Sequence, residues 1–84
     1  MATVKAIAPV RGWLLVSEAL ESVLITTLSG EPVKVHVGTE EPAVDAPAHL
    51  MSIGVPFSMS GVYAQNIYIQ SGCLVPVEVQ VTAA

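Results

Sequence analysis

The carboxyl-terminal part of the chain alternates apolar and polar residues with a period of two. In "NIYIQSG", residues 66–72, Ile67 and Ile69 alternate with polar positions, and in "CLVPVEVQV", residues 73–81, a valine occupies every second position from Val75 onward. A period of two places successive side chains on opposite faces of a strand, so both stretches predict half-buried β-strands. The Ser-Gly pair between them predicts a turn.

The same alternation occurs upstream. "PVKVHV", residues 32–37, places three valines on one face and Lys34 and His36 on the other. Its proline stands at the strand entrance, where a strand tolerates a missing hydrogen-bond donor. "HLMSIGVPFSMSG", residues 49–61, predicts one or two short strands with a bend at its internal Gly and Pro.

The amino-terminal half is less clear-cut. Residues 1–10 predict an edge strand or an arm that pairs with another chain, because "ATVKAIA" carries few charges and ends at Pro9. Residues 13–25 fit two descriptions: apolar residues at helical spacing favour a helix, whereas the β-branched "SVLITTL" favours strands. We favour two strands that meet near "SEALES", with a helix as the alternative.

Together these segments predict six to eight short strands separated by Gly, Pro and Ser turns, with residues 38–49 as a long surface loop. This spacing is typical of an all-β domain, either a small antiparallel β-sandwich or a barrel of jelly-roll-like form. A chain of 84 residues makes one domain, so residues 1–84 are assigned to a single β domain.

The composition predicts that the chain associates with others. Hydrophobic residues make up 52% of the chain and charged residues 12%, against about 25% charged in an ordinary soluble domain. Folding as a monomer would bury about 8,000 Å² of surface, roughly 60% of it apolar, and stabilise the folded state by on the order of 120 kcal/mol. The loss of conformational entropy, at about 1.5 kcal/mol per residue, costs on the order of 125 kcal/mol. Because the two nearly cancel, we expect further burial in a homo-oligomer.

The charge excludes several classes of partner. The net charge is −4, and the only certain cations are Lys5, Arg11 and Lys34. Nucleic acids and anionic membranes are bound through clusters of positive charge, so neither is expected as a partner. No apolar run reaches the roughly 18 residues of a membrane span, and the start lacks the apolar run of a signal peptide. The chain is expected to be made and used in a cytoplasm, or in something assembled there.

One stretch gathers side chains that bind metals. Within fourteen residues stand two imidazoles and three carboxylates: His36, Glu40, Glu41, Asp45 and His49. The spacing matches no known ligand pattern, and a Pro-rich loop does not preorganise a metal site. We favour a solvated acidic loop and expect no cofactor and no metal, with a site on His36, Asp45 and His49 as the alternative.

No catalytic constellation is evident. Cys73 is the only cysteine, so it forms neither an intrachain disulfide nor a CxxC pair, and a small buried apolar side chain is its simplest role. Its only conceivable bases are His36 and His49, and no phosphate loop, GxSxG turn or HExxH pair accompanies them. We expect no enzymatic activity.

The aromatic residues predict a contact surface more readily than a sugar-binding platform, because they are few and lie on different segments. Phe57 is assigned to the core. Tyr68 points away from Ile67 and Ile69, which places it on the solvent face or at an interface. The candidate interface residues are Val4, Ile7, Trp13, Tyr63 and Tyr68.

The pattern resembles a family. "ITTLSGEPVKVHVGTEEP" has the form of a strand, a turn, a valine-alternating strand and a Gly-Thr loop. "VPFSMSGVYAQNIYIQSG" has the form of two strands joined by a short turn, and a valine-rich strand follows. Over roughly residues 22–82 the chain looks like the small all-β virion proteins of tailed bacteriophages, although their usual first turn is Asn-Thr-Gly.

The resemblance implies a function without catalytic residues: a capsid decoration or cement protein in the virion, which binds the major capsid protein or another virion protein. It also implies a trimer, since decoration proteins often occupy three-fold positions of the capsid. A head-fibre base or tail adaptor is the alternative within the family. A β-sandwich module that binds a carbohydrate or peptide is the alternative from another class.

Overall fold

Eight β-strands and no helix make up the part of the chain that the computed structural model describes, which is residues 3–18, 22–27, 31–43, 46–51, 56–60 and 65–83. The strands are β1 (Thr3–Ala8), β2 (Leu14–Glu18), β3 (Ser22–Thr27), β4 (Val33–Gly38), β5 (His49–Met51), β6 (Phe57–Ser60), β7 (Asn66–Ser71) and β8 (Val77–Ala83). Between residues 13 and 25 the described positions form β2 and β3, so the strand interpretation is confirmed there and the helix is wrong. None of the described segments forms a helix that could span a membrane.

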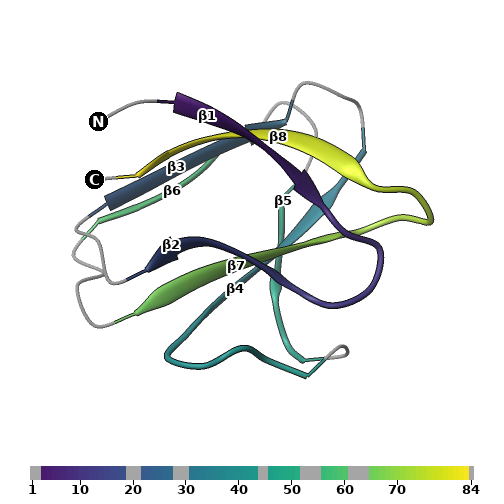
Figure 1. Ribbon diagram of the computed structural model, residues 1–84, viewed down its shortest axis with the longest axis horizontal. Helices are drawn as coiled ribbons and strands as arrows, with labels where there is room; N and C mark the ends of the chain where they lie inside the picture. The colour runs from purple at the N-terminus through teal and green to yellow at the C-terminus, as the bar shows by residue number, and fades with distance from the viewer. Residues whose placement is uncertain are drawn as a thin grey trace.

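The strands form two antiparallel sheets that face each other (Figure 1). The first sheet has the order β1-β8-β3-β6 and the second has the order β2-β7-β4-β5. Each strand pairs with the strand equally far from the opposite end of the chain: β1 with β8, β2 with β7, β3 with β6 and β4 with β5. The chain is therefore one long hairpin rolled up on itself, and rolling adds the pairs β3–β8 and β4–β7.

This strand order is that of a jelly roll, in which two sheets share the strands of two Greek keys. The expected all-β sandwich of six to eight strands is confirmed. A closed barrel is not formed in the described part, because β1, β6, β2 and β5 stand at the ends of their sheets. The chain therefore has two pairs of edges.

The core lies between the sheets and is built by the alternating residues. Val77, Val79 and Val81 of β8 face it, as do Ile67 and Ile69 of β7. All five are at most 2% exposed, and these β-branched side chains suit the pleated surface of a strand. Phe57, which was assigned to the core, is half-buried and packs against this cluster from the edge strand β6.

The amino-terminal segment takes the first of its two expected forms, an edge strand. β1 pairs with β8 across six positions, from Thr3 with Thr82 to Ala8 with Val77, and Ala8 is fully buried. An exposed ion pair of 3.6 Å joins Lys5 to Glu78 on this edge. β1 is therefore part of the fold, and its removal would turn β8 into an edge strand.

A bulge in β2 places a hydroxyl in the core. The register of β2 against β7 shifts between Leu15, which pairs with Tyr68, and Ser17, which pairs with Ile67. The extra residue turns Ser17 toward the space between the sheets, where it is 3% exposed. Its Oγ has no hydrogen-bond partner among the described residues, and a buried hydroxyl without a partner lowers stability.

Ser17→Ala is therefore expected to raise the free energy of unfolding by about 1 kcal/mol, because it removes an unsatisfied polar group while keeping the Cβ. In a domain of this size that corresponds to a melting temperature higher by about 4–8 °C. Thermal and urea unfolding followed by circular dichroism would measure it. Ser71→Ala is the matched control: this hydroxyl is similarly buried but bonds to the 73–75 segment, so its loss should lower stability. Equal losses in both variants would contradict the prediction.

Candidate functional site

The outer face of the second sheet carries a cluster of three rings. His36 of β4 pairs in register with Tyr68 of β7, so both side chains lie on the face opposite Ile67 and Ile69. The ring of His36 lies between the other two, with centroids 5.7 Å from Trp13 and 6.3 Å from Tyr68. The planes are tilted by 55° and 57°, an edge-to-face type of arrangement that favours aromatic contacts.

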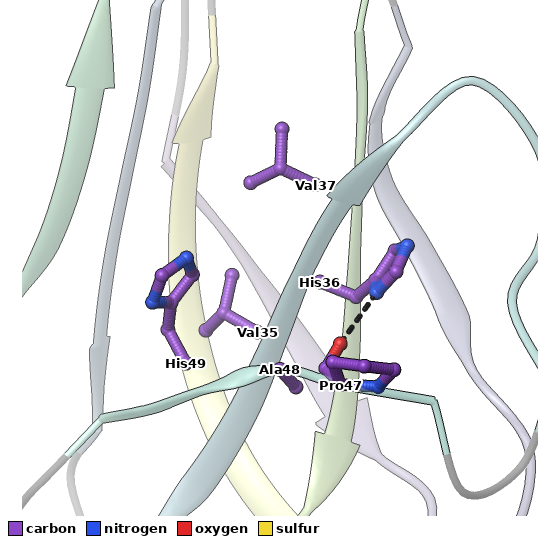
Figure 2. A pocket seen from close by; sticks show the side chains of 6 residues that line it. All are labelled: Val35, His36, Val37, Pro47, Ala48 and His49. Carbon is purple, nitrogen blue, oxygen red and sulfur yellow. Dashed lines mark hydrogen bonds between the residues drawn. The ribbon is translucent and has the colours of Figure 1, made fainter.

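The cluster holds the long connection between β4 and β5. The indole Nε1 of Trp13 donates a hydrogen bond of 2.8 Å to the carbonyl oxygen of Ala43. Nδ1 of His36 lies 2.8 Å from the carbonyl oxygen of Pro47 (Figure 2); since a carbonyl only accepts, this nitrogen carries the proton. Nδ2 of Asn66 donates to the carbonyl oxygen of Thr39 at 3.4 Å. Two strand residues, His36 and Asn66, and Trp13 just before β2 thus bind a connection whose described part forms no strand.

Two of the residues expected at an interface, Trp13 and Tyr68, are buried within the chain. Trp13 and Tyr68 are 8% and 5% exposed, so their side chains are buried by the chain itself and offer little surface to a partner. The alternation correctly put Tyr68 on the face opposite the isoleucines, but no periodic signal shows that a loop and a tryptophan cover that face. Tyr63, the other tyrosine of the expected interface, lies outside the described residues.

The histidines considered for a metal site lie on opposite faces of the second sheet. His49 of β5 pairs with Val35 and so shares the core-facing side, at the open edge, whereas His36 points outward. Figure 2 shows the two rings on either side of β4. Glu40 and Glu41 are exposed in the connection, and Asp45 lies outside the described residues. Within the described ranges no three His, Cys, Asp or Glu side chains gather as a possible metal site.

Cys73 is joined to neither histidine by a hydrogen bond in the described part of the chain. It is half-buried, its amide donates to Oγ of Ser71 at 3.2 Å, and its thiol lies 3.5 Å from the carbonyl oxygen of Val75. A thiol nucleophile needs a base within hydrogen-bond reach. The described contacts of Cys73 are those of a residue that shapes the turn between β7 and β8.

A hollow of about 300 Å³ opens beside β4 where the short β5 begins (Figure 2). Four apolar side chains and the two histidines line it: Val35, Val37, Pro47, Ala48, His36 and His49. Its walls offer mainly aliphatic contacts, which suits an apolar side chain better than a charged ligand.

Exposed apolar side chains concentrate at the sheet edges. Six of the ten exposed large hydrophobic residues in the described ranges lie on the four edge strands: Val4, Ile7, Leu14, Leu15, Leu50 and Met59. Val4 and Ile7, both expected at an interface, are 57% and 49% exposed. They lie on opposite faces of β1, because Val4 pairs with Val81 and Ile7 with Glu78.

Among the described residues, the most exposed large hydrophobic one was not a sequence-based candidate. Leu74, in the connection between β7 and β8, is 93% exposed, and Val75 beside it is 51% exposed. The signal was present in "SGCLVP", where two aliphatic residues stand between a glycine and a proline in an expected turn.

Comparison with family models, curated proteins and solved structures gives no match to the chain. Function is therefore inferred from the geometry of the surface and its clusters.

Gly38→Ala is expected to loosen the connection over the ring cluster. A Cβ at Gly38 would lie 2.9 Å from Nε2 of His36, so the imidazole would have to shift from its position between Trp13 and Tyr68. We expect the free energy of unfolding to fall by about 1 kcal/mol. The emission of Trp13, the only tryptophan, should shift to longer wavelength as water reaches the indole.

The His36→Ala and Gly38→Ala/His36→Ala variants form the control cycle. Once the imidazole is absent, the alanine at position 38 has nothing to displace. The loss in free energy of unfolding caused by Gly38→Ala should therefore largely disappear in the His36→Ala background. Strictly additive costs would show that Gly38 acts through something other than the histidine.

Proposed function

We propose that this chain is a non-enzymatic structural protein of a bacteriophage particle, a decoration or cement protein that assembles in the host cytoplasm and binds the capsid surface as a homo-oligomer, in its simplest form a trimer. Its partners are further copies of itself and the major capsid protein or another virion protein. The alternative within the family is a head-fibre base or tail adaptor. Such a protein would use the same surfaces but bind at a different place on the particle.

The observation that carries the proposal is the apolar surface on all four edge strands. An open edge presents unpaired backbone groups, and proteins that remain monomeric protect such edges with charges, prolines or bulges. Here β1 carries one charge, Lys5, while Val4 and Ile7 are exposed beside it. Edges of this kind favour pairing with another chain.

The buried rings speak against the carbohydrate-binding alternative. A sugar-binding face needs exposed aromatic rings on which the apolar side of a pyranose can stack. Trp13 and Tyr68 are buried and Phe57 is half-buried. The outer face of the first sheet carries Ser, Thr and Gln side chains with no aromatic residue among its described positions.

Changes at the β1 edge should weaken association without unfolding the chain. In the double variant Val4→Lys/Ile7→Lys, charged side chains replace apolar ones that are already about half exposed, so we expect self-association to weaken at least tenfold while the circular dichroism spectrum is unchanged. Leu24→Lys is the matched control, because Leu24 is 43% exposed but lies on the interior strand β3. Sedimentation velocity would measure both. An equal effect of Leu24→Lys would argue against an edge contact.

Binding to the particle is tested with empty capsid shells assembled from the major capsid protein of the phage that carries this gene under the proposal. We expect the purified chain to co-sediment with the shells at saturable stoichiometry and to remain bound in about 1 M salt, because an apolar contact is not screened. Release by salt would contradict the apolar contact. Failure to co-sediment, together with binding to an immobilised glycan or peptide, would instead support the binding module.

A further inference from the structure

The connection between β7 and β8 forms an apolar projection, which we call the knob and define as Leu74 and Val75. Figure 1 shows this connection extending beyond the rest of the sheets at one end of the molecule. Leu74 is 93% exposed, and no charged residue occurs in the chain between residues 66 and 77. An aliphatic side chain held almost entirely in water represents a cost that a partner would remove.

The knob is held in one conformation by Ser71. The buried hydroxyl of Ser71 donates to the carbonyl oxygen of Val75 at 2.5 Å and accepts from the amide of Cys73 at 3.2 Å. Two backbone bonds fix the base of the connection: the amide of Ser71 to the carbonyl of Pro9 at 2.7 Å, and the amide of Gly72 to that of Pro32 at 3.0 Å. A preorganised projection loses little entropy when it binds.

The same chain carries a hollow that fits the knob. The hollow beside β4 is lined mainly by Val35, Val37, Pro47 and Ala48 and has a volume of about 300 Å³. An apolar cavity of about 150 Å³ already holds a benzene molecule. There is thus room for the side chain of Leu74 with part of Val75.

The knob cannot reach the hollow of its own chain. β4 and β7 are antiparallel, with Ser71 opposite Val33 and Ile67 opposite Val37. The knob leaves the sheet after Ser71, whereas the hollow extends from Val35 to Val37, about 7–13 Å along the strand in the opposite direction. A knob that fills the hollow would therefore come from another molecule.

Charges beside the two surfaces are complementary. Two charged residues adjoin the segments that the Ser71–Pro9 and Gly72–Pro32 bonds tie to the base of the knob: Arg11 is exposed, whereas Glu31 is half-buried. Glu40 and Glu41 are exposed in the connection that supplies Pro47 and Ala48 to the hollow. Opposite charges at the rim of a contact favour the matched orientation and speed encounter, and contribute little to affinity at high salt.

We propose that the knob of one copy inserts into the hollow of a second copy, with Arg11 facing Glu40 and Glu41. The two surfaces are different, so the contact is heterologous and each copy can both donate and accept. Such contacts form a closed ring, such as a trimer, when the rotation between copies closes, and a filament when it does not. The knob adjoins the end of β1, so the edge and the knob belong to one contact surface. This contact rests on the proposed function, since it gives the residues through which the copies would assemble.

The test uses two complementary variants. Leu74→Asp removes the knob and Ala48→Trp fills the hollow, and both positions are exposed, so the fold should persist by circular dichroism. In sedimentation velocity each variant alone should associate at least tenfold more weakly than the unaltered chain. Mixed together, the Ala48→Trp chain still donates its knob and the Leu74→Asp chain still offers its hollow. The mixture should therefore form a 1:1 heterodimer that grows no further.

Leu24→Asp is the control, since it places the same charge on the open face of the first sheet and should leave association unchanged. His49→Trp provides a second way to fill the hollow should Ala48→Trp disturb the fold. Three outcomes would each overturn the inference. The unaltered chain could prove monomeric, Leu74→Asp could associate as strongly as the unaltered chain, or the two variants could fail to associate when mixed. Particle binding is measured separately: if Leu74→Asp assembles normally but no longer binds capsid shells, the knob belongs to the capsid contact, and the proposed function stands without this inference.

Discussion

The fold depends on the pairing of β8 with β3 and of β7 with β4. The four hairpin pairs alone would give a long ribbon with both faces open to water. The register Ile25 with Val81 and Val35 with Ile69 closes that ribbon into two sheets and brings the fully buried valines and isoleucines together. Because a strand has a period of two, a shift of one residue in either pairing would turn these side chains outward, so the core fixes the register.

The two outer faces differ as a consequence. The first sheet presents Thr, Gln and Ser side chains to water together with Ile7 and Leu24, and a single exposed ion pair occurs in the described ranges. The second sheet is covered by the β4–β5 connection, whose carbonyl groups bind Trp13 and His36. The chain therefore builds a second, smaller layer of packing outside the sandwich, and this layer shapes the hollow beside β4.

Features that arise from periodicity were predictable from the sequence, whereas those that depend on tertiary neighbours were not. Alternating valines identified β4 and β8 and their buried faces, because a strand buried on one face repeats every second residue. The burial of Tyr68 could not be predicted, since Trp13 and the β4–β5 connection lie at least 20 positions away in the sequence and show no period. Nor did alternation reveal that His36 and His49 would lie on opposite faces, because that depends on the register between β4 and β5. Leu74 escaped notice because its exposure is a property of a turn and not of a strand.

The pairing of β1 with β8 has a further consequence. Thr3 lies opposite Thr82, so the two described ends of the chain emerge side by side, and the knob lies beyond the far end of the same strand pair (Figure 1). The six paired residues of β1 separate the Thr3–Thr82 end of this strand pair from its Ala8–Val77 end by about 17–20 Å. A peptide or domain fused at the Thr3–Thr82 end of this strand pair would thus be displayed away from the loops around the knob.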